Sequence, residues 1–215
     1  MKKAKPDIKL IIFDVDGTLI DTALYIVMNY THLFLKYHKP VPSLETMVYF
    51  SGPPLVDIFK EYFPEIDQKE LLDEFQSFAS TYDNVLSRLY PDEINVLNEL
   101  KEAGYLLAIQ TSKRAQSLSH NLDHFDMSDL FSSIICLDSG LKPKPDPAGI
   151  KYILNKLDVK EEEAFIIGDS ETDIEAGKRA NIHTGLVIYG LKKIPDIQSD
   201  EEYASFKDIE RSFLL

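Results

Sequence analysis

The chain of 215 residues contains one cysteine and no long hydrophobic run. Because Cys136 stands alone, no disulfide bond can form within the chain. Cys136 lies in the apolar stretch 133–137, where a small buried side chain is more typical than a reactive thiol. The apolar run that follows the N-terminal lysines spans only residues 10–13, which is too short for a signal-peptide core or a membrane span. We therefore expect a cytoplasmic protein.

Basic residues are also scarce, since 23 lysines and arginines face 36 aspartates and glutamates and the formal net charge is −13. No basic cluster could displace the counterions of a nucleic acid, which argues against nucleic-acid binding. The same charge disfavours an anionic membrane surface as a partner. An anionic substrate would need a local positive pocket within this unfavourable field.

Five short apolar runs have the length and composition of strands, at residues 10–13, 105–111, 133–137, 164–168 and 185–189. Helical patterns lie between most of them, at residues 92–103, 147–157 and 173–180. Strands that alternate with helices indicate βαβ units. The sequence therefore predicts the α/β class, with a doubly wound parallel sheet.

One connection departs from this alternation, because residues 22–89 contain helix-like stretches and no convincing strand. The helical stretches are residues 23–37, 54–63 and 69–89. A structureless loop of that length is improbable in a compact domain, so we expect an all-helical cap folded over the sheet. The predicted organisation is a catalytic core formed by residues 1–20 and 90–215, with the cap at residues 21–89.

Asp14 and Asp16 directly follow the first apolar run, ahead of Gly17 and Thr18. Ligand sites of open α/β sheets lie beyond the carboxyl ends of the strands, so both acids stand where chemistry is usually done. Like charges this close repel unless a cation or protons neutralise them. For the two aspartates alone, an exposed turn capped by acids explains the pattern equally well.

Polar residues follow three later strands as well: Thr111 and Ser112, the lysine- and proline-rich run 142–147, and the acidic run 168–173. Because the carboxyl ends of parallel strands share one edge of the sheet, these groups should converge on one cleft with Asp14 and Asp16. Several carboxylates, a hydroxyl and a lysine suit a hard cation and a phosphate, and Mg²⁺ prefers oxygen ligands of this kind.

With these four motifs in this order, the chain resembles the haloacid dehalogenase superfamily over essentially its whole length. Its run 16–22, Asp-Gly-Thr-Leu-Ile-Asp-Thr, and its run 142–147, Lys-Pro-Lys-Pro-Asp-Pro, most resemble the phosphoglycolate phosphatase-like branch of capped phosphatases. The resemblance implies a Rossmann-like core and a Mg²⁺-dependent phosphatase that acts through an aspartyl-phosphate.

By that resemblance Asp14 would be the nucleophile, and Asp16 would be the general acid and then the general base. The carboxylates of Asp14 and Asp169, with the backbone carbonyl of Asp16, would hold the metal. Thr111 would hydrogen-bond the phosphoryl oxygens.

Two lysines compete for the remaining position. The family pattern places the functional lysine first, so Lys142 is chosen to neutralise the nucleophile, and Lys144 is expected to be a solvated loop residue. Asp173 would orient Lys142 or a metal-bound water.

Departures from the family pattern discriminate among its branches. The dehalogenase and phosphonate-cleaving branches lack the second aspartate, so Asp16 disfavours both. The β-phosphoglucomutase branch carries a histidine where this chain has Ile26, which disfavours a mutase. A non-catalytic phospho-acceptor module or binding protein is disfavoured by the inserted segment and the intact motifs.

The expected substrate is a small phosphorylated metabolite. Phosphoglycolate, sugar phosphates, nucleotides and pyrophosphate all present the same phosphoryl group, so the corresponding phosphatases remain alternatives. Ser112, Lys113, Ser51 and Gly52 are the candidate contacts to the rest of the substrate. For the last two, a simple turn between helices explains the sequence equally well, and Lys113 could equally be a solvated loop residue.

Overall fold

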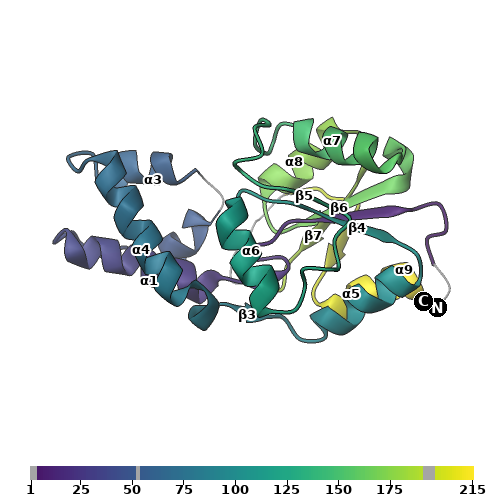
Figure 1. Ribbon diagram of the computed structural model, residues 1–215, viewed down its shortest axis with the longest axis horizontal. Helices are drawn as coiled ribbons and strands as arrows, with labels where there is room; N and C mark the ends of the chain where they lie inside the picture. The colour runs from purple at the N-terminus through teal and green to yellow at the C-terminus, as the bar shows by residue number, and fades with distance from the viewer. Residues whose placement is uncertain (1–3, 52–53, 191–196) are drawn as a thin grey trace.

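The computed structural model describes residues 4–51, 54–190 and 197–215. Its centre is a parallel sheet of six strands in the order β5-β4-β1-β6-β7-β8, with helices on both faces (Figure 1). Parallel pairs join all neighbours in this sheet, as the alternation of strands and helices predicts. The expected α/β class with a doubly wound parallel sheet is confirmed.

Five of these strands correspond to the predicted apolar runs: β1 (Leu10–Phe13), β4 (Leu106–Gln110), β5 (Ser133–Ile135), β6 (Ala164–Gly168) and β7 (His183–Val187). The sixth strand, β8 (Glu201–Tyr203), was not predicted. It carries two glutamates and lies at the edge of the sheet, where charged residues are common and the apolar signal is weak.

The two faces of the sheet bury alternate residues of the central strand. Ile11 and Phe13 pack with helices α5 (Glu93–Glu102), α6 (Ala115–His124) and α9 (Phe206–Leu214). Leu10 and Ile12 pack on the opposite face, mainly with α7 (Ala148–Leu157) and α8 (Glu171–Arg179). Every residue of β1 is buried, which explains why its sequence is continuously apolar.

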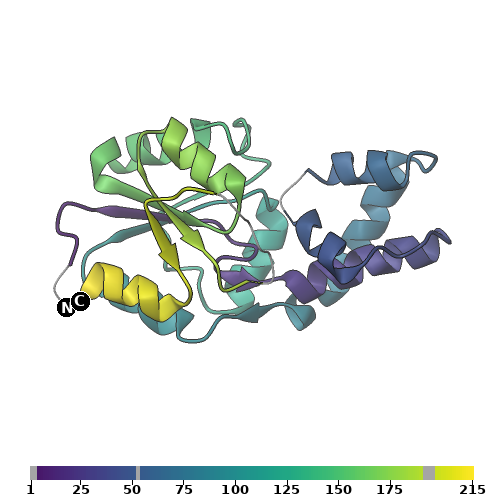
Figure 2. The same cartoon turned by 180° about the vertical axis from the view of Figure 1, so that it is seen from behind.

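Cys136 is buried in the first of these clusters, as expected for a small apolar side chain. After α7, a short 3₁₀ turn, η2 (Glu161–Glu163), leads into β6. At one end of the sheet the first described residues lie beside α9, where the amide of Ala4 donates to the carbonyl of Phe213 (Figure 2).

Between β1 and β4 the chain leaves the sheet and forms a group of helices, which we call the inserted helices: α1 (Ala23–Lys36), α2 (Leu44–Met47), the 3₁₀ turn η1 (Val48–Phe50), α3 (Leu55–Tyr62) and α4 (Gln68–Leu86). They enclose a separate aromatic cluster that includes Tyr30, Phe34 and Phe59. Figure 1 shows them beside the sheet, at the end where β1 leads out of it.

The inserted segment is not purely helical at its base. β2 (Ile20–Asp21) and β3 (Arg88–Leu89) pair antiparallel where the chain leaves and returns. The prediction of a helix up to residue 89 was therefore wrong by three residues, because Arg88 and Leu89 gain strand partners that local propensity does not reveal. Within the described residues, no helix is both long and apolar enough to cross a membrane.

Glu93 begins α5 and is almost fully buried, with its Oε2 accepting from the amide of Tyr90. Burial raises the pKa of Glu93 to about 9, and the hydrogen bond from Tyr90 only partly opposes this. The folded chain thus holds the Glu93 proton more tightly than the unfolded chain, where the pKa is near 4.5.

Stability should therefore fall as the pH rises between about 4.5 and 9, because only the unfolded state releases this proton readily. Glu93→Gln keeps an acceptor for Tyr90 and removes the titration. We predict that its melting temperature relative to the parent chain rises steadily from pH 5 to pH 8.5, measured by calorimetry. A difference that does not change with pH would contradict this assignment.

Candidate active site

The polar groups that follow β1, β4 and β6 converge on one pocket at the carboxyl edge of the sheet. Its lining combines hydroxyls, carboxylates and one lysine: Asp14, Asp16, Ser51, Thr111, Ser112, Lys144, Asp169, Ser170 and Thr172. This is the convergence that the sequence predicts for parallel strands.

Asp14 and Asp16 are held by a tight loop directly after β1. The amide of Asp14 donates to the carbonyl of Ile167, which continues the pairing with β6. Gly17 adopts φ +81°, and a Cβ there would lie 2.4 Å from Oδ2 of Asp169. Glycine is therefore required both for the backbone conformation and for the close approach of Asp169.

Asp169 and Asp173 belong to the turn from β6 into α8. Oδ2 of Asp173 accepts from the amide of Ser170 at 3.0 Å and from its hydroxyl at 2.5 Å, while Ser170 Oγ caps the amide of Asp173. A Cβ on Gly168 would meet Cγ of Asp173 at 2.3 Å, so only glycine leaves room for this carboxylate. The capping box thus fixes Asp173, which is fully buried, in one orientation.

The structure corrects the choice between the two lysines. Nζ of Lys144 lies 2.9 Å from Oδ1 of Asp14 and 2.5 Å from Oδ1 of Asp173, and its side chain is 3% exposed. Lys142, which was predicted to neutralise the nucleophile, is 81% exposed and lies 3.8 Å from Asp146. The lysine beside Asp14 is therefore Lys144, and Asp173 orients Lys144 rather than Lys142.

These buried charges perturb one another. Burial raises the pKa of Asp14 to about 6, against the opposing influence of Lys144. Burial also disfavours the charge of Lys144, but Asp14 and Asp173 together hold its pKa above the usual range. Lys144 thus stays cationic and is further fixed by its bond to the carbonyl of Gln110, at 3.2 Å.

Thr111 and Ser112 follow β4 and line the same pocket, as predicted. Thr111 is buried, and its Oγ1 accepts from the amide of Lys113 at 3.1 Å. Because that hydroxyl already accepts a hydrogen bond, its proton can be donated to an oxygen in the pocket. Ser112 is exposed at the pocket rim.

Lys113 does not line either of the two pockets at this edge. Its side chain is 6% exposed, and its ammonium lies between Asp16, at 3.0 Å, and Asp83 of α4, at 3.4 Å. The alternative of a solvated loop residue is therefore wrong, because two carboxylates of the chain itself hold the ammonium. The other alternative, a contact with the substrate, stays a prediction.

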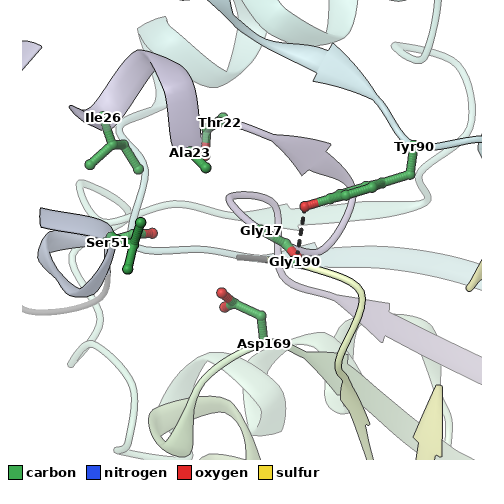
Figure 3. Close-up of a pocket in the computed structure, with 9 residues that line it drawn as sticks. Gly17, Thr22, Ala23, Ile26, Ser51, Tyr90, Asp169 and Gly190 are labelled. Carbon is green, nitrogen blue, oxygen red and sulfur yellow. Dashed lines mark hydrogen bonds between the residues drawn. The ribbon is translucent and has the colours of Figure 1, made fainter. Parts of the chain in front are cut away.

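A second pocket adjoins the first, between the inserted helices and the loop after β1 (Figure 3). Ala23 and Ile26 line it from α1, Ser51 faces it from beyond η1, and Asp169 lies at its floor. The hydroxyl of Tyr90 donates to the carbonyl of Gly17 at 3.3 Å. Ser51 lines both pockets, whereas Gly52 lies outside the described residues.

Asp14, Asp169 and Asp173 each offer a carboxylate oxygen, and these atoms lie within 4.8 Å of one another. Asp173 already binds Lys144 and Ser170 with both oxygens, which leaves Asp14 and Asp169 as the better ligands. Lys144 contacts two of these three carboxylates, Asp14 and Asp173. Hard oxygen donors of this kind fit Mg²⁺.

Several residues that line the two pockets were not predicted as site residues, among them Lys144, Ser170, Thr172 and Tyr90. Ser170 and Thr172 stand within the acidic run that was identified, next to Asp169 and Asp173. Lys144 stands in the second of two overlapping Lys-Pro-x-Pro runs, so the pattern fitted either lysine. Tyr90 lies just after the inserted segment, and no sequence motif around it indicates that it lines a pocket.

Comparison with known proteins agrees with this geometry. A family model for haloacid dehalogenase-like hydrolases matches residues 11–187. A protein of Halalkalibacterium halodurans named pyrophosphatase PpaX is 31% identical over 186 residues, covering 86% of each chain. The Bacillus velezensis protein of the same name is 33% identical over 182 residues, covering 85% of this chain and 84% of the relative.

A solved structure described as a predicted phosphoglycolate phosphatase, from Haemophilus somnus, superposes with a TM-score of 0.83. It is 26% identical in sequence, and the match covers 95% of this chain and 97% of that chain. The family resemblance noted in the sequence is confirmed. The chain belongs to the haloacid dehalogenase-like hydrolases and is an enzyme of that family's phosphatase type.

Proposed function

We propose that the chain is a Mg²⁺-dependent phosphatase that hydrolyses a small phosphorylated metabolite through an aspartyl-phosphate on Asp14. The observation that carries this proposal is the contact of the buried Lys144 with Asp14 at 2.9 Å, in a pocket that Asp16, Thr111 and Asp169 also line. A carboxylate needs no deprotonation to act as a nucleophile, but it needs positive charge nearby to approach an anionic phosphate.

In the first half of the reaction, an oxygen of Asp14 attacks phosphorus and forms an O–P bond. The bond from phosphorus to the leaving oxygen breaks, and Asp16 donates its proton to that oxygen. Thr111 and Lys144 stabilise the negative charge on the transferring group by hydrogen bonding and by electrostatic attraction.

In the second half, a water molecule attacks the same phosphorus and gives a proton to Asp16. The bond to Asp14 breaks, so that free phosphate leaves and both aspartates return to their starting states. One residue can serve as acid and then as base because the two half-reactions transfer a proton in opposite directions.

Mg²⁺ would be held by the carboxylates of Asp14 and Asp169 with the carbonyl of Asp16. When bound, the metal offsets the repulsion between the nucleophile and the phosphate. Asp173 binds the ammonium of Lys144 and so keeps it beside Asp14. The exposed Lys142 takes no part in orienting Asp14.

We further propose that residues 21–89 act as a cap over a core formed by residues 1–20 and 90–215. The separate aromatic cluster of the inserted helices and the pocket beneath them support this division. A cap that covers the phosphoryl site would exclude water and contact the leaving group. Ser51, Ile26 and Ala23 are placed to make those contacts.

Pyrophosphate is a second candidate substrate, because the two bacillary relatives are named pyrophosphatases. The structural relative from Haemophilus somnus is instead described as a predicted phosphoglycolate phosphatase. Both compounds present a phosphoryl group to the same core residues, so the choice depends on the leaving-group pocket.

We predict that the purified chain releases phosphate from 4-nitrophenyl phosphate with Mg²⁺ and stops when EDTA is added. A panel of pyrophosphate, phosphoglycolate, sugar phosphates and nucleoside monophosphates then ranks substrates by kcat/KM.

Asp14→Asn should lose at least about a thousandfold in kcat, because an amide is a far weaker nucleophile than a carboxylate. Its circular dichroism should match that of the parent chain.

The proposal fails if no member of the panel releases phosphate. Substantial activity of Asp14→Asn would place the nucleophile elsewhere, and full activity in EDTA would exclude the metal requirement. A clear preference for pyrophosphate would favour the second candidate.

The two lysines of the proline-rich run provide a matched pair of variants. Lys144→Met should lower kcat/KM by about a hundredfold to a thousandfold, as is typical when an electrostatic stabiliser of the transferring group is removed. Lys142→Met should change kcat/KM less than twofold, because that side chain is exposed and does not line the pocket. Similar losses in both variants, measured with 4-nitrophenyl phosphate, would argue against this assignment.

A further inference from the structure

A buried ion cluster connects the inserted helices to the reaction pocket. Nζ of Lys113 lies 3.0 Å from Oδ1 of Asp16 and 3.4 Å from Oδ2 of Asp83. The side chains of Lys113 and Asp83 are only 6% and 8% exposed, whereas that of Asp16 is 23% exposed toward the pocket. One ammonium is thus shared between a residue of the pocket and a residue of α4.

Asp83 is fixed by neighbours on two helices. Ser87 donates to its Oδ1 at 2.9 Å from the end of α4, and Ser117 of α6 donates to its Oδ2 at 3.1 Å. One residue further along α4, Asn84 accepts from Asn121 at 2.7 Å and donates to the carbonyl of His120 at 3.3 Å. The carboxylate that faces Lys113 therefore moves only if α4 moves relative to α6.

Lys113 is fixed at its backbone as well. Its amide donates to Thr111 Oγ1, and its carbonyl accepts from the amide of Leu137 at 3.0 Å. Its ammonium also lies 5.5 Å from the ring centre of Tyr25, on α1. Because backbone, carboxylates and ring all constrain this side chain, few positions are open to its ammonium.

We propose that Lys113 is a positioning residue that orients Asp16 toward the leaving oxygen, and that α4 sets the position of Lys113 through Asp83. The inference rests on the proposed phosphatase function, in which Asp16 transfers the proton. Lys113 contacts Oδ1 of Asp16, so Oδ2 is the oxygen that carries the proton. The arrangement makes the proton donor of the core dependent on the placement of an inserted helix.

This role has a consequence that depends on the leaving group. A phenolate with electron-withdrawing groups departs with little help from a proton, whereas an alkoxide requires one. Disorienting Asp16 should therefore harm alkyl phosphates much more than 4-nitrophenyl phosphate. The relevant quantity is kcat/KM, because it covers the steps up to departure of the leaving group and excludes later hydrolysis of the aspartyl-phosphate.

The test compares kcat/KM for 4-nitrophenyl phosphate and for an alkyl phosphate such as glycerol phosphate. Lys113→Met has a side chain of similar length without the charge. We expect its loss on the alkyl phosphate to exceed its loss on the aryl phosphate by about tenfold to a hundredfold, a part of the usual general-acid contribution. Asp83→Asn, which keeps Lys113 beside Asp16, should show the same bias to a smaller degree.

Lys113→Met leaves Asp83 buried without a cation, which can prevent folding. The double variant Lys113→Met/Asp83→Asn removes both charges and should show the same dependence on the leaving group. Lys36→Met serves as the matched control, because it removes a different ion pair of α4, that with Glu74, and leaves the contacts of Asp83 intact. Any loss in Lys36→Met should be equal for the two substrates.

Equal losses on both substrates in Lys113→Met and in the double variant would overturn the proposal, as would unchanged activity. A bias of similar size in Lys36→Met would also overturn it, since the effect would then come from loss of any ion pair on α4. The activity of the parent chain in the same assay distinguishes failure of the phosphatase proposal from failure of the proposal on Lys113. If it releases no phosphate from either substrate, the phosphatase function fails, and if it does, the variants decide the role of Lys113.

Discussion

The reaction pocket depends on the burial of one ammonium, that of Lys144, between Asp14 and Asp173. Two carboxylates this close and this buried repel each other and are poorly solvated, so they require a cation at short range. Lys144 supplies it and also bonds the carbonyl of Gln110, which joins the loop after β5 to the end of β4. The orientation of Asp14 toward the pocket follows from this arrangement.

The same contact connects the pocket to the fold. Asp173 closes the capping box at the start of α8, and Gly168 and Gly17 provide the space in which Asp173 and Asp169 approach the loop after β1. A substitution at Gly17, Gly168 or Asp173 would therefore displace or remove one of the carboxylates of the pocket. Helix capping, glycine placement and electrostatics are therefore parts of one constraint rather than separate features.

The net charge of −13 makes an anionic substrate unfavourable unless the site itself is locally positive. The described part of the chain places two lysines with buried side chains at this edge of the sheet. Lys144 contacts Asp14, and Lys113 contacts Asp16. Each aspartate thus contacts a different lysine, in agreement with the different tasks that we propose for Asp14 as nucleophile and Asp16 as proton carrier.

Much of the fold could be predicted because its signals are local. The buried strands β1 and β6 appear in the sequence as continuous apolar runs with their observed bounds. The edge strand β8 could not be predicted, since it is charged and gains its structure only by pairing with β7. Leu89 and Arg88 were assigned to a helix for the same reason.

The residues of the site also divide into those that a local pattern identifies and those that depend on contacts distant in sequence. Asp14, Asp16, Thr111 and Asp169 were identified from their places after strands, and the structure brings all four to one pocket. The choice between Lys142 and Lys144 could not be made from the pattern, because both precede a proline and only the path of the loop decides which one points inward. The burial of Lys113 depends on Asp83, a residue 30 positions away on an inserted helix.

The central claim is that Asp14 is a nucleophile held ready beside Lys144 in a site that binds Mg²⁺. Beryllium fluoride mimics a phosphoryl group and binds an aspartate carboxylate only where a phosphoryl group could be accepted, and ¹⁹F NMR detects the bound species. We predict bound fluorine resonances for the parent chain with Mg²⁺ and none for Asp14→Asn. Bound resonances of equal intensity in Asp14→Asn would contradict the account.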